Sequence, residues 1–227
     1  MKRIVFLTFL LVIFIPSSLL MAQSGQQKRW VIIDAAHGGT DGGVIVTDKI
    51  REKEVTLSLS QLLQKELART PGIQVQMTRA SEKTMSIAER LKIVRAAPAE
   101  ALFISLHVNA GFGKNASGYE IFFPGFKAAP EDKGDSQVIL KDMVKNKNLN
   151  DSVRFAQAIQ RNMENVFPRK GRGLREAPIP ILNDLTLTAV VLEIGFATNT
   201  DDRKKIMSEK TQQAIAQALS KSINDFF

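Results

Sequence analysis

Cysteine is absent from all 227 residues of this chain. The fold therefore cannot rest on disulfide bonds, and lipid attachment to a cysteine is excluded. Histidine is nearly absent as well, because His37 and His107 are the only two. Aromatic residues make up only 7% of the chain. Nucleic acid, which proteins commonly bind through aromatic and basic side chains together, is therefore not an expected partner.

Residues 1–22 contain no acidic side chain and have the pattern of a secretory signal peptide. Two basic residues precede an apolar run at residues 4–15 that only Thr8 interrupts. This run is shorter than the roughly 20 apolar residues that span a membrane. We expect cleavage after Ala22 and export to the periplasm or cell envelope. A retained membrane anchor is the alternative, because residues 19–22 are also apolar.

Cleavage would lower the net charge from +8 to +6, because the removed segment carries two basic side chains. We interpret residues 23–28 as a flexible tail and residues 29–227 as one domain, long enough to bury a full hydrophobic core. The basic balance suits an anionic partner such as a cell-wall polymer. A well-solvated surface explains the charge equally well.

Stretches with the period of a strand alternate along the chain with stretches of helical period. Strands are expected at residues 30–34, 73–77, 101–106, 117–123 and 189–194, with an extended segment at 178–182. Helices are expected after residue 52, after the capping-box pattern at Ser86 and Glu89, across residues 156–166, and across residues 215–223. Loops are expected at residues 38–49 and around Gly171 and Gly173. The order predicts an α/β fold: a single layered domain with a central, mostly parallel or mixed sheet of about six strands flanked by helices.

Residues 126–150 interrupt this alternation. They are polar and of mixed charge, with an apolar cluster only between Val138 and Met143. We interpret them as a partly helical surface insertion that precedes a separate helix.

Both histidines follow or end apolar strands, and so does Glu193. Ligands of α/β sheets gather at the carboxyl ends of strands, so we expect these three side chains to lie near one another. Two histidines without cysteine suggest a metal site that a carboxylate completes, as in many catalytic zinc sites. The residues alone leave four candidates for that carboxylate, and for Glu52 a role at the start of a helix is an equal alternative. The candidates are Asp34, Asp41, Glu52 and Glu54.

Glu193 follows a strongly apolar run, and burial of its carboxylate would raise its pKa and suit it to proton transfer. An exposed acid at a strand end is the alternative. Together with a metal, such a base would support hydrolysis of an amide or ester. The same ligand set also holds ferrous iron in oxygenases, but those sites usually lie on β-barrels rather than on alternating strands and helices.

Four blocks of this sequence, in order, resemble the zinc-dependent N-acetylmuramoyl-L-alanine amidases of the amidase type 3 family. The blocks are residues 33–43, 51–55, 102–110 and 191–199. The resemblance covers nearly the whole chain after residue 30. It implies zinc on His37, Glu52 and His107, with Glu193 as the catalytic acid and base.

The resemblance also implies the substrate, which is the amide between N-acetylmuramic acid and L-alanine of peptidoglycan, cleaved in wall turnover or daughter-cell separation. A catalytically inactive wall-binding module is the alternative, although binding alone would not need Glu193. The family usually has Asp-Pro-Gly-His where this chain has Asp34-Ala35-Ala36-His37, and a proline where Gly42 stands.

Further expectations concern substrate and partners. Arg172 and Arg175 lie in a block that resembles one beside the family's active site, and with Asn109 they are expected to contact substrate. Some relatives carry a regulatory helix over the zinc where this chain has residues 126–150. We therefore expect that this segment covers the site and that an activator protein acts on it. A monomer is expected.

Overall fold

The structure is a computed structural model, and it describes residues 28–111, 113, 115–125, 136–183 and 185–227. The predicted signal peptide, most of the predicted tail and residues 126–135 lie outside this part of the chain. Within it, no helix combines the length and the apolar character needed to cross a membrane.

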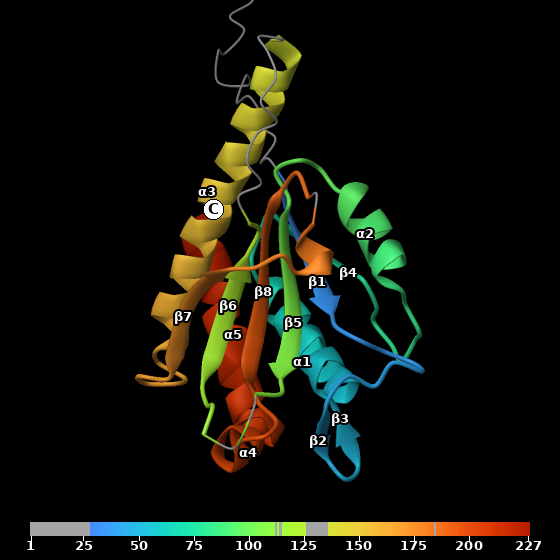
Figure 1. Cartoon of the computed structure of the whole chain (residues 1–227), viewed down its shortest axis with the longest axis vertical. Coiled ribbons are helices and arrows are strands. Elements are labelled where there is room, and N and C mark those ends of the chain that lie inside the picture. Colours follow the sequence, from blue (N-terminus) through green and yellow to red (C-terminus); the bar gives the residue numbers. More distant parts are fainter. Residues whose placement is uncertain (1–27, 112, 114, 126–135, 184) are drawn as a thin grey trace, which may run out of the picture.

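The centre of the molecule is a mixed sheet of six strands (Figure 1). In spatial order the strands are β4 (Ile73–Met77), β1 (Arg29–Ala35), β5 (Leu102–Asn109), β8 (Thr188–Phe196), β6 (Tyr119–Phe123) and β7 (Gly171–Glu176). The first four are parallel to one another, whereas β6 pairs antiparallel with β8 and parallel with β7. The predicted fold class is confirmed.

Helices cover both faces of the sheet and bury two hydrophobic clusters. One face packs against α1 (Glu52–Leu67), α3 (Ser136–Met163) and α5 (Glu209–Phe226), and the other against α2 (Ile87–Arg95) and the short 3-10 helix η2 (Pro180–Leu182). The larger cluster forms because apolar residues recur at helical spacing on the inner faces, as Val55, Leu59 and Leu63 do in α1. A short helix, α4 (Thr200–Met207), follows β8.

Two segments expected to be loops contain strands. β2 (Ile45–Thr47) and β3 (Ile50–Arg51) form a small hairpin directly before α1. The sequence of β7, GRGLRE, has almost no apolar pattern and suggests a glycine turn, but the segment is a strand because it pairs with β6 along the sheet edge. The segment at 178–182, expected to be extended, contains the single turn of η2.

Helix α3 corrects two expectations about residues 126–150. The described part of that segment is the first half of one continuous helix, with no break at residue 150. Asn148 Nδ2 donates to the Thr186 carbonyl at 2.7 Å, and the Ala189 amide donates to Ser152 Oγ at 3.0 Å, so α3 crosses the amino end of β8 there. Residues 136–147 therefore lead away from the carboxyl ends of the strands, as the projecting end of α3 shows in Figure 1. The expectation that Val138 to Met143 covers the site is wrong for this structure.

Candidate metal centre and catalytic site

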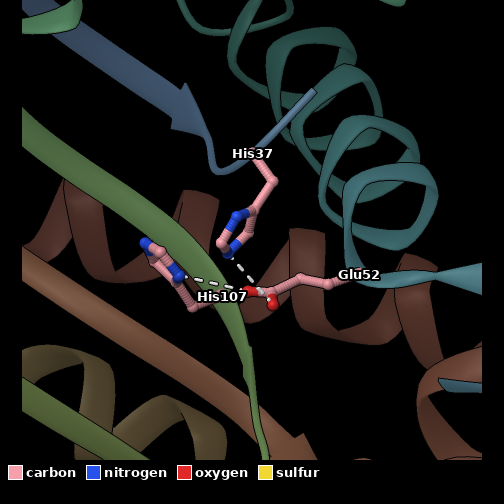
Figure 2. Close-up of side chains that lie close together, drawn as sticks. All are labelled: His37, Glu52 and His107. Atoms are coloured by element: carbon pink, nitrogen blue, oxygen red, sulfur yellow. Dashed lines mark hydrogen bonds and ion pairs between the residues drawn. The ribbon is translucent and has the colours of Figure 1, made fainter. Parts of the chain in front are cut away.

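Three side chains from separate elements meet at the carboxyl ends of the parallel strands. His37 lies in the turn after β1, Glu52 is the first residue of α1, and His107 lies in β5. His37 Nε2 lies 3.1 Å from Glu52 Oε2, and His107 Nδ1 lies 3.1 Å from Glu52 Oε1 (Figure 2). One possible ligand atom of each residue lies within 4.8 Å of the others. The structure thus brings together the three residues that the resemblance implies as ligands.

The other carboxylates that the sequence left open have different contacts. Asp34 is buried and accepts hydrogen bonds from Thr78 and Ser105. Asp41 Oδ2 lies 2.8 Å from His37 Nδ1, on the side of the ring that faces away from Glu52. Glu54 accepts a hydrogen bond from the Arg51 amide at the start of α1. Of the four candidates, Glu52 alone contacts both histidines.

The local chain holds Glu52 closely. Its Oε2 accepts the amide of Val44 at 3.0 Å, and its Oε1 accepts the amide of Val108 at 2.9 Å. Gly43 has a φ of 63°, and a Cβ at this position would lie 2.5 Å from Glu52 Oε2 and 2.7 Å from His37 Cδ2. A glycine is therefore required where the loop passes over the two side chains.

Protonation equilibria in the cluster are strongly coupled. Burial of His37 opposes its charged form, but its contacts with Glu52 and Asp41 outweigh this effect and raise its pKa to about 9. Burial of Glu52 likewise opposes its charge, and the two histidines lower its pKa to about 2. The pKa of His107 is also raised by Glu52 against the effect of burial. In the cluster without a metal ion, Glu52 thus favours the protonated form of both histidines, and the histidines favour the ionised form of Glu52.

This donor set fits a divalent metal ion. Two imidazoles and one carboxylate are a common protein ligand set for catalytic zinc. Asp41 contacts the ring nitrogen of His37 that faces away from the cluster, which is the usual arrangement for orienting a metal-binding histidine. His37, Glu52 and His107 could therefore hold zinc through the atoms that now contact one another.

Glu193 lies beside this cluster in the sheet. In the register of the strands it is opposite His107 of β5 on one side and Glu120 of β6 on the other. Its Oε2 is buried and has no hydrogen-bond partner among the described residues. Burial raises the pKa of Glu193 to about 7, with His107 opposing this shift and Glu52 and Glu120 adding to it. An unpartnered carboxyl group with this pKa is suited to take up and release a proton near neutral pH.

Glu120 is a site residue that the sequence interpretation missed. Its side chain is buried and accepts a hydrogen bond from Asn109 Nδ2 at 2.9 Å and one from Arg172 Nε at 2.8 Å. Arg175 Nη2 lies 3.5 Å from the same carboxylate. The three residues expected to contact substrate therefore converge on one acid beside Glu193. The only sequence signal was an acidic residue within the apolar stretch of β6.

A histidine–glutamate–histidine cluster beside a half-buried acid, at the strand ends of an α/β sheet, is an arrangement that could support metal-dependent hydrolysis. The family model described as N-acetylmuramoyl-L-alanine amidase, Amidase_3, matches residues 31–225. The chain belongs to this family, whose members are N-acetylmuramoyl-L-alanine amidases.

The chain is also similar to individual proteins and solved structures. The chain is 29% identical over 201 residues to the uncharacterized protein YqiI of Bacillus subtilis, covering 88% of this chain and 86% of YqiI. It is 23% identical to the N-acetylmuramoyl-L-alanine amidase AmiA of Escherichia coli, covering 91% of this chain and 78% of AmiA. Its fold is that of the CwlD amidase from Clostridioides difficile, solved in complex with the GerS lipoprotein, with a TM-score of 0.70, 24% identity, and coverage of 88% and 98% of the two chains.

Proposed function

We propose that this protein is a zinc-dependent hydrolase of peptidoglycan that cleaves the amide between the lactyl group of N-acetylmuramic acid and L-alanine. The observation that carries the proposal is the buried Oε2 of Glu193, which has no hydrogen-bond partner among the described residues, beside the His37–Glu52–His107 cluster. The membership in the amidase family supports this bond as the target. Cleavage leaves a glycan and a free peptide, as wall turnover or daughter-cell separation requires.

In this proposal His37, Glu52 and His107 would hold zinc, which when bound would supply a Lewis acid for the amide carbonyl and for water. Glu193 accepts the proton of the attacking water as a general base. It then delivers this proton to the amine nitrogen of L-alanine as the C–N bond breaks. A carboxyl group whose pKa is about 7 can perform both transfers, because its two protonation states are close in free energy at neutral pH.

Arg172 and Arg175 are proposed to hold a carboxylate of the stem peptide. Both contact the single carboxylate of Glu120, so the three side chains together carry one excess positive charge next to Glu193. Each arginine side chain also remains partly exposed, at 37% for Arg172 and 51% for Arg175. Asn109 completes the group through its hydrogen bond to Glu120 and would lie beside the substrate.

We infer that the chain is exported, as the pattern of residues 1–22 indicates, and acts as a monomer in the periplasm or cell envelope. The complex of CwlD with a lipoprotein supports an activating protein partner for this chain as well. The first half of α3 is the proposed contact, because Leu140, Met143 and Val144 lie on one exposed face there.

Mass spectrometry of purified sacculi digested by the protein tests the proposal. We expect free peptides that begin with L-alanine, and their loss when a chelator removes the metal. Glu193→Gln keeps the shape of the side chain and should lower the rate by about 10²–10⁴-fold with the zinc content unchanged. If peptides appear at the same rate after chelation, the proposed metal dependence is refuted. If the Glu193→Gln variant releases peptides at the wild-type rate, the proposed role of Glu193 as general base is refuted.

A further inference from the structure

The turn that carries His37 has a backbone conformation that needs support from outside. His37 has a φ of 60°, and Gly38 and Gly39 follow with φ values of 133° and 61°. For a residue with a side chain, the left-handed region costs roughly 1–2 kcal/mol. Such a conformation persists only where surrounding contacts impose it. The backbone preference of His37 alone therefore does not direct its ring toward Glu52.

Two arginines from other elements hold the carbonyl groups of this turn. Arg79, two residues after β4, donates from Nε to the Ala35 carbonyl at 2.9 Å and from Nη2 to the Ala36 carbonyl at 3.0 Å. Arg90 of α2 donates from Nη1 to the Ala35 carbonyl at 2.8 Å and from Nη2 to the carbonyl of His37. Three successive carbonyl groups are thus fixed by two planar guanidinium groups.

These arginines are buried, which is costly for a cation unless its charge and its donors are satisfied. The side chain of Arg79 is 0% exposed and that of Arg90 is 5% exposed. Asp34, itself buried, places Oδ1 2.6 Å from Arg90 Nη1, while Glu82 lies at 3.8 Å from Arg79 Nη1. Two arginines and one aspartate thus form an interior network, in which removal of Arg90 or Asp34 would leave the other without its ion-pair partner. Removal of Arg79 would instead leave the Ala35 and Ala36 carbonyl groups without the donors of that side chain.

The same network reaches the two other segments that carry candidate ligands. Arg79 Nη2 also donates to the carbonyl of Lys53, the second residue of α1, at 2.8 Å. Asp34 Oδ2 accepts a hydrogen bond at 2.6 Å from Ser105 Oγ in β5, the strand that carries the second histidine. The network therefore joins the turn after β1, the start of α1 and the middle of β5 through hydrogen bonds.

We propose that Arg79, Arg90 and Asp34 are positioning residues that hold the three ligand-bearing segments in their relative places before a metal ion binds. The inference rests on the proposed function in that the His37–Glu52–His107 cluster is a metal site. A site held in place in advance binds its metal more tightly, because less ordering is left for the binding step. None of the three positioning residues needs to touch metal or substrate.

Zinc affinity of the full chain, measured by competition with a chromophoric chelator, tests this inference. Arg79→Met and Arg90→Met should each weaken zinc binding by about 10–100-fold, the usual cost of losing a residue that supports metal ligands. Arg95→Met, which changes an exposed arginine of the same helix as Arg90, is the matched control and should bind zinc normally. Arg90→Lys should bind zinc nearly as weakly as Arg90→Met, because one ammonium group cannot reproduce the planar, forked set of donors of a guanidinium group.

The visible spectrum of Co²⁺ bound in place of zinc gives a second readout, because it reports ligand geometry. We expect it to change in the Arg79 and Arg90 variants and to stay the same in the Arg95 control. Affinities are compared where each metal-free variant has an unfolding free energy above about 3 kcal/mol. Under about 1% of the chain is then unfolded, so a loss of stability by itself does not change the affinity.

Thr78→Val covers the case in which the Arg79 and Arg90 variants fail to fold. It removes one hydroxyl that donates to Asp34 Oδ1 at 2.6 Å and keeps the volume of the side chain. We expect weaker zinc binding in a folded protein. Wild-type affinity and an unchanged Co²⁺ spectrum in the folded variants would overturn the positioning role. A wild-type chain that binds no zinc would instead refute the proposed function.

Discussion

At the scale of single residues, the pKa values of the site depend on carboxylates and histidines that lie close together and are partly or fully buried. Two histidines lower the pKa of Glu52 and favour its ionised form, whereas burial raises the pKa of Glu193 and favours its protonated form. The two acids lie near each other yet have pKa values of about 2 and about 7. Such a separation assigns different tasks to them, with Glu52 fitted to bind a cation and Glu193 fitted to transfer a proton.

Glu120 contributes to that separation, and Glu120→Gln tests it. Removing this negative charge beside Glu193 should lower the pKa of Glu193, because a neighbouring like charge opposes ionisation. The acid limb of the pH profile of kcat/KM should therefore move to lower pH. The maximal rate should change less than about tenfold if the pKa of Glu193 moves by about one unit, since one pKa unit corresponds to roughly 1.4 kcal/mol.

Glu100→Gln is the control for this change. It removes the same charge from an exposed residue before β5, at the end of the strand far from the site. Its pH profile should match that of the wild type. An acid limb that stays in place in the Glu120 variant would show that the two carboxylates are not coupled.

At the scale of elements, strand register and helix position determine which residues meet. The parallel pairing of β5 and β8 sets His107 beside Glu193, and the antiparallel pairing of β8 and β6 adds Glu120 to the same row. The hairpin of β2 and β3 brings the chain back so that α1 starts next to the ends of β1 and β5. Helix α3 instead directs its first turns away from this row.

The exposed face of α3 allows a test of its role. Replacing Leu140, Met143 and Val144 together by glutamine should change the unfolding free energy by less than about 1 kcal/mol, because these side chains are 51–63% exposed. Hydrolysis of purified sacculi without any partner should stay at the wild-type rate, since the face lies far from the cluster. Stimulation by an activator protein should be lost. A large rise in the basal rate would show that α3 inhibits the enzyme.

At the scale of the whole molecule, the cluster links stability to pH and to metal. In the metal-free protein the pKa of His37 is about 9, above its ordinary value of 6.5. Protonated His37 therefore stabilises the fold fully below pH 6.5, and this contribution is lost as the pH rises through 9. Glu52 has the opposite sign: its contribution is present above pH 4.5 and lost as the pH falls through 2.

Thermal unfolding of the chelated protein should show this loss between pH 7 and pH 9. A pKa difference of about 2.5 units for a mostly buried group corresponds to a decrease on the order of 1–3 kcal/mol. The His37→Gln variant should lack most of this decrease. The zinc-loaded protein should lack it too, because metal replaces the protons. A chelated protein whose stability is constant over this range would contradict the coupled cluster.

Local sequence patterns predicted most of the elements correctly. The apolar alternation of residues 73–77 and the helical spacing of Val55, Leu59 and Leu63 depend on burial of one face, which neighbouring residues encode. The same holds for the apolar runs that end near His37, His107 and Glu193. These patterns were enough to place both histidines and one acid at the same edge of a sheet.

The tertiary structure alone decided how those residues combine. The residue patterns alone left four carboxylates open and the family resemblance implied Glu52, whereas the structure shows that Glu52 faces both histidines because the β2–β3 hairpin returns the chain to the strand ends. The sequence interpretation missed Glu120, took β7 for a turn and divided the continuous helix α3 into two segments. Edge pairing and cross-strand register depend on residues far apart in the chain, so local patterns do not predict them. The local residue types thus indicated the chemistry of the site. Its geometry depends on contacts between residues far apart in the chain, which a local hydrophobic period does not encode.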